Sequence, residues 1–262
     1  MSVYSIIQYL KYILFSSHKR GHGIHSPFVF NLIIKVFRNK ISPDIVFKVE
    51  MIRKKLNSDK RYISVTDFGT GSEVRENKLV KVSEIAKKSS VPKRYCKLLA
   101  GLSEEFGRPS IIEFGTSFGI STMYLAAANK ETTVYTMEGC PVISEIARDN
   151  FKEAGLNNIK LFSGSFEQLL PEIANTKIKP GLVFIDGNHR KQPTIEYFNW
   201  IADLSDENTV IVLDDIYYSP EMGEAWNEIK QNKRVSTTID IFRMGIVFFR
   251  EGMTRFDYNI RY

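Results

Sequence analysis

From residue 110 to residue 213 the sequence repeats one pattern: a short apolar run, a turn, and a longer segment of good helix formers. The apolar runs are 110–114, 133–137, 159–162, 182–185 and 209–213, and the helical segments between them begin at Ile120, Pro141, Phe166 and Pro193. Apolar strands that alternate with helices predict a mostly parallel sheet that is covered on both faces. Because parallel crossovers are right-handed, few topologies remain, and we expect a doubly wound α/β fold.

The order changes after a further helical segment that begins near Ser219. Two strand-like runs, 235–242 and 245–250, then follow each other with only Arg243 and Met244 between them. A parallel return would need roughly a dozen residues or more, so these two strands are expected to be antiparallel. The full expectation is a Rossmann-like, seven-stranded sheet that closes with a C-terminal antiparallel hairpin.

Residues 1–95 lack this alternation, apart from one strand-like run at 62–65. We expect them to form a mainly helical N-terminal cap, and residues 96–262 to form the α/β domain. Within the cap, the apolar residues of segment 4–15 fall at helical spacing and are interrupted by Lys11. The run is shorter than the roughly 20 apolar residues that span a bilayer, and it lacks the flanks of a signal peptide. It is expected to be an amphipathic helix that packs on the rest of the chain, with no membrane span.

Composition excludes several classes of protein. With 43% hydrophobic and 25% charged residues, the chain does not have the composition of a disordered protein. Its two cysteines, Cys96 and Cys140, are too few for a disulfide framework or, by themselves, for a structural zinc site. This cysteine content favours a reducing compartment, and a cytoplasmic location is expected.

Charge is unevenly distributed along the chain. Residues 1–110 hold 21 basic and 9 acidic residues, whereas residues 111–262 hold 15 basic and 21 acidic residues. A basic surface can bind the phosphates of a nucleic acid or a membrane, and it can equally neutralise an acidic part of the same chain. The basic stretch 78–97 contains a single aromatic residue, Tyr95, so we favour a solvated helical face over an RNA-binding surface.

Two further segments imitate functional motifs but are expected to be loops. His18, His22 and His25 are spaced closely enough for zinc or phosphate binding, but a fourth ligand is not evident, and the glycines and Pro27 favour a structured loop. The segment 67–72 is rich in glycine, yet the polar residues after it do not fit the start of a core-facing helix. We interpret it as a loop and leave a lid over a ligand open as an alternative.

The turn after the first strand of the repeat is the first place to look for a ligand site. Ligands of open parallel sheets collect outside the carboxyl ends of the strands, where helix N-termini offer free N–H groups. Here Gly115 allows a tight turn, and Gly119 allows a close approach of the helix. Glu113 would repel a pyrophosphate and suits a ligand with ammonium and sulfonium charges. Glu138, at the end of the next strand, can accept hydrogen bonds from two ribose hydroxyls.

The acidic, glycine-rich motif from Glu113 to Gly119, the acids at the ends of the second and fourth strands, and the terminal hairpin resemble class I S-adenosylmethionine (SAM)-dependent methyltransferases over about residues 95–250. The spacing of three glycines that a dinucleotide site requires is missing. The resemblance implies SAM as cofactor, with Glu113 and Gly115 at its methionine moiety, Glu138 at its ribose and residues 164–166 near its adenine. The implied cofactor-binding residues are Glu113, Gly115, Thr116, Ser117, Gly119, Ser121, Glu138, Gly164, Ser165, Phe166 and Asp186.

Two details qualify the extent of this resemblance. Ser165 departs from the family, in which many members have an acidic residue at this position. The segment 21–30 is similar to that of a group of bacterial class I methyltransferases of comparable length, and it extends the resemblance over nearly the whole chain.

Further acids follow two neighbouring strands: Asp186 comes after the fourth apolar run, and Asp214 and Asp215 come after the fifth. Carboxylates that converge at one sheet edge repel each other unless a cation is present, and Mg²⁺ prefers oxygen ligands of this type. His189, three residues after Asp186, is suited to removing a proton from a hydroxyl. The acids could instead have structural roles, with Asp186 capping the segment after it and the other two starting a turn.

Within the superfamily, these residues resemble the metal-dependent O-methyltransferases of the catechol and sugar type. The resemblance implies that Asp186, Asp214 and Asp215 bind Mg²⁺ and that His189 and Asp186 are catalytic. The expected function is SAM-dependent methylation of a small-molecule acceptor at a hydroxyl oxygen, with assistance by Mg²⁺ left open.

Two alternatives stay open. One is a methyltransferase that acts on RNA or another nucleic acid, which the basic N-terminal part would suit. Against one subtype, the chain lacks the loop of an asparagine or aspartate followed by two prolines that is used for exocyclic base amines. The other is a non-catalytic SAM-binding protein, in which the acids are structural. The terminal hairpin is expected to be able to pair across a homodimer.

Overall fold

The structure, a computed structural model, describes residues 2–16, 24–38, 41–66, 78–175, 178–252 and 254–262. Two compact units make up the chain. The middle unit consists of residues 39–178, and the terminal unit combines residues 1–38 with residues 179–262. Among the described residues, no helix is both long enough and apolar enough to cross a membrane.

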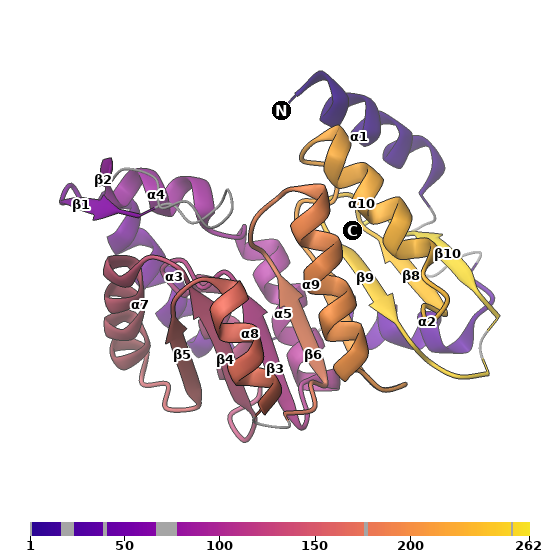
Figure 1. Cartoon of the computed structure of the whole chain (residues 1–262). Coiled ribbons are helices and arrows are strands. Elements are labelled where there is room, and N and C mark those ends of the chain that lie inside the picture. Colours follow the sequence, from indigo (N-terminus) through magenta and orange to yellow (C-terminus); the bar gives the residue numbers. More distant parts are fainter. Residues whose placement is uncertain (1, 17–23, 39–40, 67–77, 176–177, 253) are drawn as a thin grey trace. The chain divides into compact units, whose positions relative to one another are not determined.

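Parallel strands form the centre of the middle unit (Figure 1). They are β3 (Ser110–Phe114), β4 (Thr133–Glu138) and β5 (Ile159–Ser163), with β4 between the other two. Every residue of β3 is buried, as expected for a strand with helices on both faces. Glu113 pairs in register with Thr136, and Met137 with Phe162, so the carboxyl ends of these strands meet at one edge.

Helices connect and cover these strands. They are α3 (Pro43–Ser58), α4 (Val82–Ser89), α5 (Lys93–Phe106), α6 (Ile120–Ala128), α7 (Pro141–Ala154) and α8 (Phe166–Asn175). Helix α7 begins with Pro141, whose fixed φ suits the first turn, and is capped by Gly155 in left-handed backbone. A small antiparallel ladder of β1 (Tyr62–Val65) and β2 (Lys78–Lys81) precedes α4.

In the terminal unit, the strands lie in the order β10, β8, β9, β7, β6 (Figure 1). Their bounds are β6 Leu182–Ile185, β7 Val210–Leu213, β8 Thr237–Asp240, β9 Gly245–Phe248 and β10 Phe256–Asn259. Strands β6 and β7 are parallel, whereas β9 is antiparallel to both β7 and β8. All residues of β6 to β9 are buried, so these strands form the core of the unit.

The helical elements of the terminal unit are α1 (Val3–Phe15), α2 (Pro27–Leu32), the π-helical turn η1 (Ile33–Phe37), α9 (Lys191–Leu204) and α10 (Pro220–Gln231). Helix α10 packs on β9, because a Cβ added to Gly245 would lie 2.6 Å from the Trp226 ring. Helix α1 is held by hydrogen bonds from Ser5 Oγ to the Tyr217 carbonyl, at 2.9 Å, and from Tyr12 Oη to a carbonyl just after β10, at 2.8 Å. The predicted helix at 4–15, packed on the rest of the chain, is confirmed.

The structure confirms the predicted α/β fold with mostly parallel strands. The strands predicted at 110–114, 182–185 and 62–65 have those bounds. The predicted hairpin forms between β8 and β9, where Asp240 pairs with Gly245. Residues 1–95 are mainly helical in their described parts. The predictions for His18, His22 and segment 67–72 concern residues outside those that the structure describes.

One expectation about the sheet was wrong. Strand β10 was not predicted, so the expected number of seven strands is too low. This strand pairs in parallel with β8, with Phe256 opposite Thr237 and Asn259 opposite Asp240. Strand β8 is hydrogen-bonded on one side to β9 and on the other to β10, and β9 is also paired with β7. Among the described strands, neither strand of the predicted hairpin therefore has an open edge.

Substitution of Gly119 and of Gly155 by alanine should have different effects on stability. Their φ values are 81° and 72°, but a Cβ on Gly119 would lie 2.3 Å from the buried Phe151 ring, whereas a Cβ on Gly155 would have nothing within 4 Å. Left-handed backbone costs a non-glycine residue roughly 1–2 kcal/mol. We expect Gly155→Ala to lower the free energy of unfolding by about this amount, and Gly119→Ala to lower it by clearly more, in urea denaturation. Equal losses for the two variants would contradict the assigned contact.

Candidate functional site

Polar and ionisable side chains that could bind a ligand or take part in catalysis lie at the carboxyl ends of strands in both units. In the middle unit they surround the segment 115–119 between β3 and α6, which we call the glycine loop. In the terminal unit they form the acid cluster, defined as Asp186, Asp214 and Asp215, with His189 beside it. All the side chains of the acid cluster follow β6 or β7.

The glycine loop is built from left-handed backbone. Gly115, Ser117 and Gly119 have φ values of 94°, 47° and 81°. The N–H groups of Gly115 and Thr116 both donate to the Met137 carbonyl, at 3.1 and 3.0 Å, which ties the loop to the end of β4. Gly119 is the N-cap of α6, so the N–H groups of the first helical turn, which have no partner inside a helix, lie at the end of the loop.

Glu113 lies fully buried among hydroxyl groups next to this loop. Its Oε2 accepts hydrogen bonds from Thr122 Oγ1 and, at 2.7 Å, from Thr136 Oγ1. Because Thr136 has a single hydroxyl proton, Thr116 Oγ1, 2.6 Å away, is the donor in the bond between the two threonines. Burial raises the pKa of Glu113 to about 7, although the hydroxyls of Ser121, Thr122 and Thr136 pull it down.

The two oxygens of Glu113 therefore differ. Oε2 is occupied by hydroxyl donors, whereas Oε1 is buried without a hydrogen-bond partner among the described residues. A buried acceptor without a donor is costly unless a ligand or water supplies one. The sequence predicted that Glu113 binds the methionine moiety of a cofactor, and the structure leaves Oε1 as the oxygen without a protein donor, in the described part of the chain, for such a contact.

Glu138, at the end of the neighbouring strand β4, is hydrogen-bonded to the glycine loop. Its Oε2 accepts from the N–H of Ser117, and its Oε1 accepts from the N–H of Cys140, both at 2.9 Å. Burial raises the pKa of Glu138, and the backbone N–H groups of Cys140, Ser117 and Gly139 offset part of this rise. A carboxylate has about four acceptor positions, so the fixed side chain keeps capacity for two further donors such as the hydroxyls of a diol.

The segment 164–166 follows β5 at the same edge of the middle unit. Gly164 has a φ of 154°, a backbone that favours glycine, and its N–H donates to the carbonyl of Glu138 at 2.9 Å. Ser165 Oγ accepts a hydrogen bond from the first turn of α8 at 3.4 Å. The ring of Phe166 packs edge-on against Phe114, with ring centroids 5.5 Å apart. The structure thus joins 164–166 to Glu138 through the backbone.

In the terminal unit, His189 lies between two carboxylates. Its Nε2 is 3.7 Å from Asp186 Oδ1 and 4.0 Å from Asp215 Oδ2. The turns that present these groups place Asn188 and Asp215 in left-handed backbone, with φ values of 52° and 51°, which asparagine and aspartate tolerate best. Burial lowers the pKa of His189, the charge of Asp215 opposes this effect, and the charge of Arg243 adds to it. The imidazole is therefore neutral near pH 7 and able to accept a proton.

Asp214 is almost completely enclosed, with 1% of its surface exposed, and it is paired with Arg243. Arg243 Nε donates to Oδ1 at 2.9 Å, and Nη2 donates to Oδ2 at 2.6 Å. The same Nη2 lies 3.5 Å from Asp215 Oδ1. Burial raises the pKa of Asp214 to about 6, the charge of Asp215 adds to the rise, and Arg243 opposes it. Asp214 is thus ionised at neutral pH and forms a two-bond ion pair.

The predicted Mg²⁺ site does not fit this arrangement. In the part of the chain that the structure describes, no group of three or more histidine, cysteine, aspartate or glutamate side chains is placed so that it could hold a metal ion. Mg²⁺ requires nearly octahedral oxygen ligands at about 2.1 Å. Arg243 binds both oxygens of Asp214 and places a fixed positive charge beside them, so Asp214 does not fit the predicted role of metal ligand.

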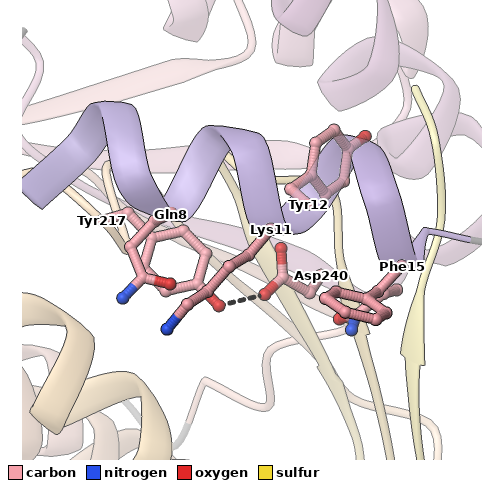
Figure 2. Close-up of a pocket in the computed structure, with 7 residues that line it drawn as sticks. Gln8, Lys11, Tyr12, Phe15, Tyr217 and Asp240 are labelled. Carbon is pink, nitrogen blue, oxygen red and sulfur yellow. Dashed lines mark hydrogen bonds between the residues drawn. The ribbon is translucent and has the colours of Figure 1, made fainter.

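The two tyrosines after Asp215 take different positions. Tyr218 is 62% exposed, and its ring centroid is 5.6 Å from that of His189. Tyr217 points away into the terminal unit, where its Oη donates to Asp240 Oδ2 at 2.6 Å (Figure 2). A cavity of about 260 Å³ opens beside this bond. Its walls consist of Gln8, Lys11, Tyr12 and Phe15 from α1, together with Tyr217, Asp240 and Asn259.

Two residues that bind the predicted site carboxylates were not identified from the sequence: Thr136, which binds Glu113, and Arg243, which binds Asp214. Thr136 is directly opposite Glu113 in the β3–β4 register, so the strand pairing would have pointed to it. Arg243 was assigned only to the hairpin turn. The pairing of Leu213 with Gly245 places this turn next to the end of β7, so the order of the strands would have revealed a cation beside Asp214.

Comparisons with known proteins agree on one family. Residues 112–216 match the family described as "Methyltransferase domain". The catechol O-methyltransferase of Niastella koreensis is 32% identical over 126 residues, which cover 47% of this chain and 55% of that protein. The O-methyltransferase imqG of Aspergillus flavus is 29% identical over 112 residues, which cover 40% of this chain and 44% of that protein. The chain thus spans about half the length of the curated relatives it matches.

Solved structures share the fold. An O-methyltransferase from Bacillus cereus in complex with S-adenosylhomocysteine (SAH) superposes with a TM-score of 0.57 at 22% identity, covering 84% of this chain and 97% of that chain. The O-methyltransferase TomG from Streptomyces achromogenes, in complex with SAM, gives a TM-score of 0.55 at 23% identity, covering 62% of this chain and 82% of that chain. Residues 112–216 thus match a methyltransferase domain, and the chain shares its fold with solved O-methyltransferases that bind SAM or SAH.

Proposed function

We propose that this chain is an O-methyltransferase that transfers the methyl group of SAM to a hydroxyl oxygen of a small molecule. The observation that carries the proposal is the fixed carboxylate of Glu138 beside the glycine loop, together with the partnerless oxygen of Glu113. The similarity to a catechol O-methyltransferase and to other O-methyltransferases supports an oxygen acceptor. We further propose residues 96–262 as the catalytic domain and residues 1–95 as its mainly helical cap.

The middle unit supplies groups that suit SAM. Oε1 of Glu113 would accept a hydrogen bond from the ammonium of the methionine moiety, and Glu138 would accept from the two ribose hydroxyls. The glycine loop, through Gly115, Thr116, Ser117, Gly119 and Ser121, would lie along the methionine and ribose. Gly164, Ser165 and Phe166 would lie near the adenine. SAM, when bound, supplies a methyl group on a positively charged sulfur.

The terminal unit supplies groups that suit proton removal. We assign His189 as the general base, with Asp186 beside Nε2 stabilising the imidazolium that forms once this nitrogen takes the proton, and we keep Asp186 as a proposed cofactor contact. The acceptor oxygen forms a bond to the methyl carbon while the bond from sulfur to that carbon breaks and its electron pair stays on sulfur. The hydroxyl proton passes to His189 Nε2. No step is assigned to Mg²⁺, because Asp214 is bonded to Arg243.

The proposed location is the cytoplasm. Cys96 and Cys140 are both free and buried, which suits a reducing compartment. Nucleic acid stays an alternative acceptor on account of the basic residues in 1–110.

Calorimetry with SAM tests the proposed function. We expect the chain to bind one SAM, and Glu138→Gln to weaken binding by about 10- to 100-fold, because a hydrogen bond to a charged group contributes roughly 1.5–3 kcal/mol. Glu131→Gln, which alters an exposed glutamate paired with Arg108, is the matched control and should bind SAM as the unaltered chain does. Absence of SAM binding would contradict the proposal. Methyl transfer to RNA, and not to hydroxyl compounds, would favour the alternative acceptor.

The raised pKa of Glu113 predicts a pH dependence of stability. Since the folded pKa of about 7 exceeds the ordinary value of 4.5, the folded chain favours the protonated form. Its stabilising contribution is complete below pH 4.5 and is lost as pH rises through about 7, by at most roughly 3 kcal/mol. We expect Glu113→Gln to flatten the decline of unfolding free energy over this range in urea denaturation without SAM.

The matched control for this measurement is Glu145→Gln, an exposed glutamate that pairs with Arg148 on α7. Its pH profile should follow that of the unaltered chain. If the unfolding free energies of Glu113→Gln and of the unaltered chain decline in parallel as pH rises, then the burial of Glu113 does not cause the pH dependence of stability.

A third prediction concerns the proposed base. His189→Gln should lower kcat by roughly 10²–10⁴-fold, the range for loss of a general base, and leave the affinity for SAM unchanged. Because burial lowers the pKa of His189, kcat of the unaltered chain should stay constant down to about pH 6.5, the ordinary value, and fall below it. Steady-state kinetics and calorimetry separate the two effects. His25→Gln, at an exposed histidine, is the control, and an unchanged kcat in His189→Gln would remove the assignment.

A further inference from the structure

We infer that Arg243 is the resident cation of the acid cluster and takes the place that a divalent metal ion would occupy, so that methyl transfer needs no such ion. The inference rests on the proposed function in so far as the acid cluster serves methyl transfer. It depends on where Arg243 lies, how the fold holds it there, and what it does to the oxygens beside it.

The contact between Arg243 and Asp214 has the geometry of a strong ion pair. Guanidinium nitrogens lie 2.9 and 2.6 Å from the two oxygens of Asp214, which matches the planar fork of arginine to a carboxylate. Burial alone would lower the pKa of Arg243, but the charges of Asp214, Asp215 and Asp186 raise it, so the guanidinium is fully ionised. Arg243 therefore interacts with every carboxylate of the acid cluster.

The β8–β9 turn holds Arg243 in this position. The N–H of Arg243 donates to the Ile241 carbonyl at 2.9 Å, and the Arg243 carbonyl accepts from the N–H of Ile216 at 3.2 Å. Phe242, with a φ of 71°, has its N–H bonded to Asp240 Oδ1 at 2.8 Å. A bulky residue adopts this backbone only where its surroundings fix it. These hydrogen bonds thus fix the backbone of the turn at Arg243.

Further packing reinforces the turn. Asp240 also accepts hydrogen bonds from Tyr217 Oη at 2.6 Å and from Trp226 Nε1 at 3.3 Å. The Phe242 ring packs edge-on against Tyr9 of α1, with centroids 5.0 Å apart. These contacts surround Phe242, so the backbone that carries Arg243 has little freedom to withdraw its side chain from Asp214.

Arg243 and a divalent ion compete for the same oxygens. A metal ion bound to Asp214 would need direct bonds to oxygens that already accept from the guanidinium, and one bound to Asp215 Oδ1 would lie next to Nη2, which is 3.5 Å from that oxygen. It would also lie within a few ångströms of a fixed positive charge, which repels it. With Arg243 in place, the three carboxylates are partly neutralised, and the reason for expecting a metal ion, their mutual repulsion, is removed. We assign Arg243 as a positioning residue, since it acts through Asp214 and Asp215.

Titration with Mn²⁺, followed by the electron paramagnetic resonance signal of the free ion, tests this inference without relying on activity. We expect the unaltered chain to leave the signal of millimolar Mn²⁺ unchanged, and Arg243→Gln to remove signal as it binds the ion with at least tenfold higher affinity. Arg243→Lys keeps the charge and should behave as the unaltered chain does. Arg234→Gln alters an exposed arginine paired with Asp203 and is the matched control.

Two results would overturn the inference. One is binding of one Mn²⁺ by the unaltered chain that is lost in Asp214→Asn. The other is a folded Arg243→Gln variant, checked by circular dichroism, that gains no affinity for Mn²⁺. If that variant does not fold, the titration of the unaltered chain still decides. Calorimetry with SAM on the same variants tests the proposed function independently of this inference. Failure to bind SAM would contradict the proposed function but would not change the Mn²⁺ result.

Discussion

The burial of carboxylates at the ends of strands is the constraint on which this structure depends. A buried carboxylate is unstable unless donors or a counter-charge surround it. The chain uses hydroxyls for Glu113, backbone N–H groups for Glu138, a guanidinium for Asp214, and a phenol, an indole and one backbone N–H for Asp240. The N–H bonds from Ser117 to Glu138 and from Phe242 to Asp240 also fix the glycine loop and the β8–β9 turn.

The kind of donor decides what chemistry each carboxylate retains. Neutral hydroxyls and N–H groups add no positive charge beside Glu113 and Glu138, so when these carboxylates are ionised the middle unit can attract a positively charged ligand. The guanidinium of Arg243 instead compensates the charge of Asp214, so the acid cluster of the terminal unit is balanced within the chain. The two units therefore use similar residues at similar positions for different purposes.

Much of the fold could be predicted because it depends on local sequence. The strand Ser110–Phe114 is a continuous apolar run, and α7 carries its own start and stop signals in Pro141 and Gly155. Strand β10 was missed because its four residues are mostly exposed and have no apolar run, so only pairing with β8 makes them a strand. The division of the chain into two units joins residues far apart in sequence, which no local pattern indicates.

The candidate site was predicted less completely, because partners across strands decide its chemistry. The acids Glu113, Glu138, Asp186, Asp214 and Asp215 could be found from their places after apolar runs. Their partners could not, since Thr136 and Arg243 are 23 and 29 residues from the carboxylates they bind. Mg²⁺ was expected because three acids follow neighbouring strands, and the sequence did not show that Arg243 lies beside them.

A crystal structure of the chain grown with SAH and Mn²⁺, with anomalous scattering recorded at the manganese edge, tests the central claim most directly. Our account predicts SAH with its ribose hydroxyls on Glu138, Arg243 on Asp214, and no anomalous peak in the acid cluster. A manganese peak bound by Asp186, Asp214 and Asp215, with Arg243 turned away, would contradict it.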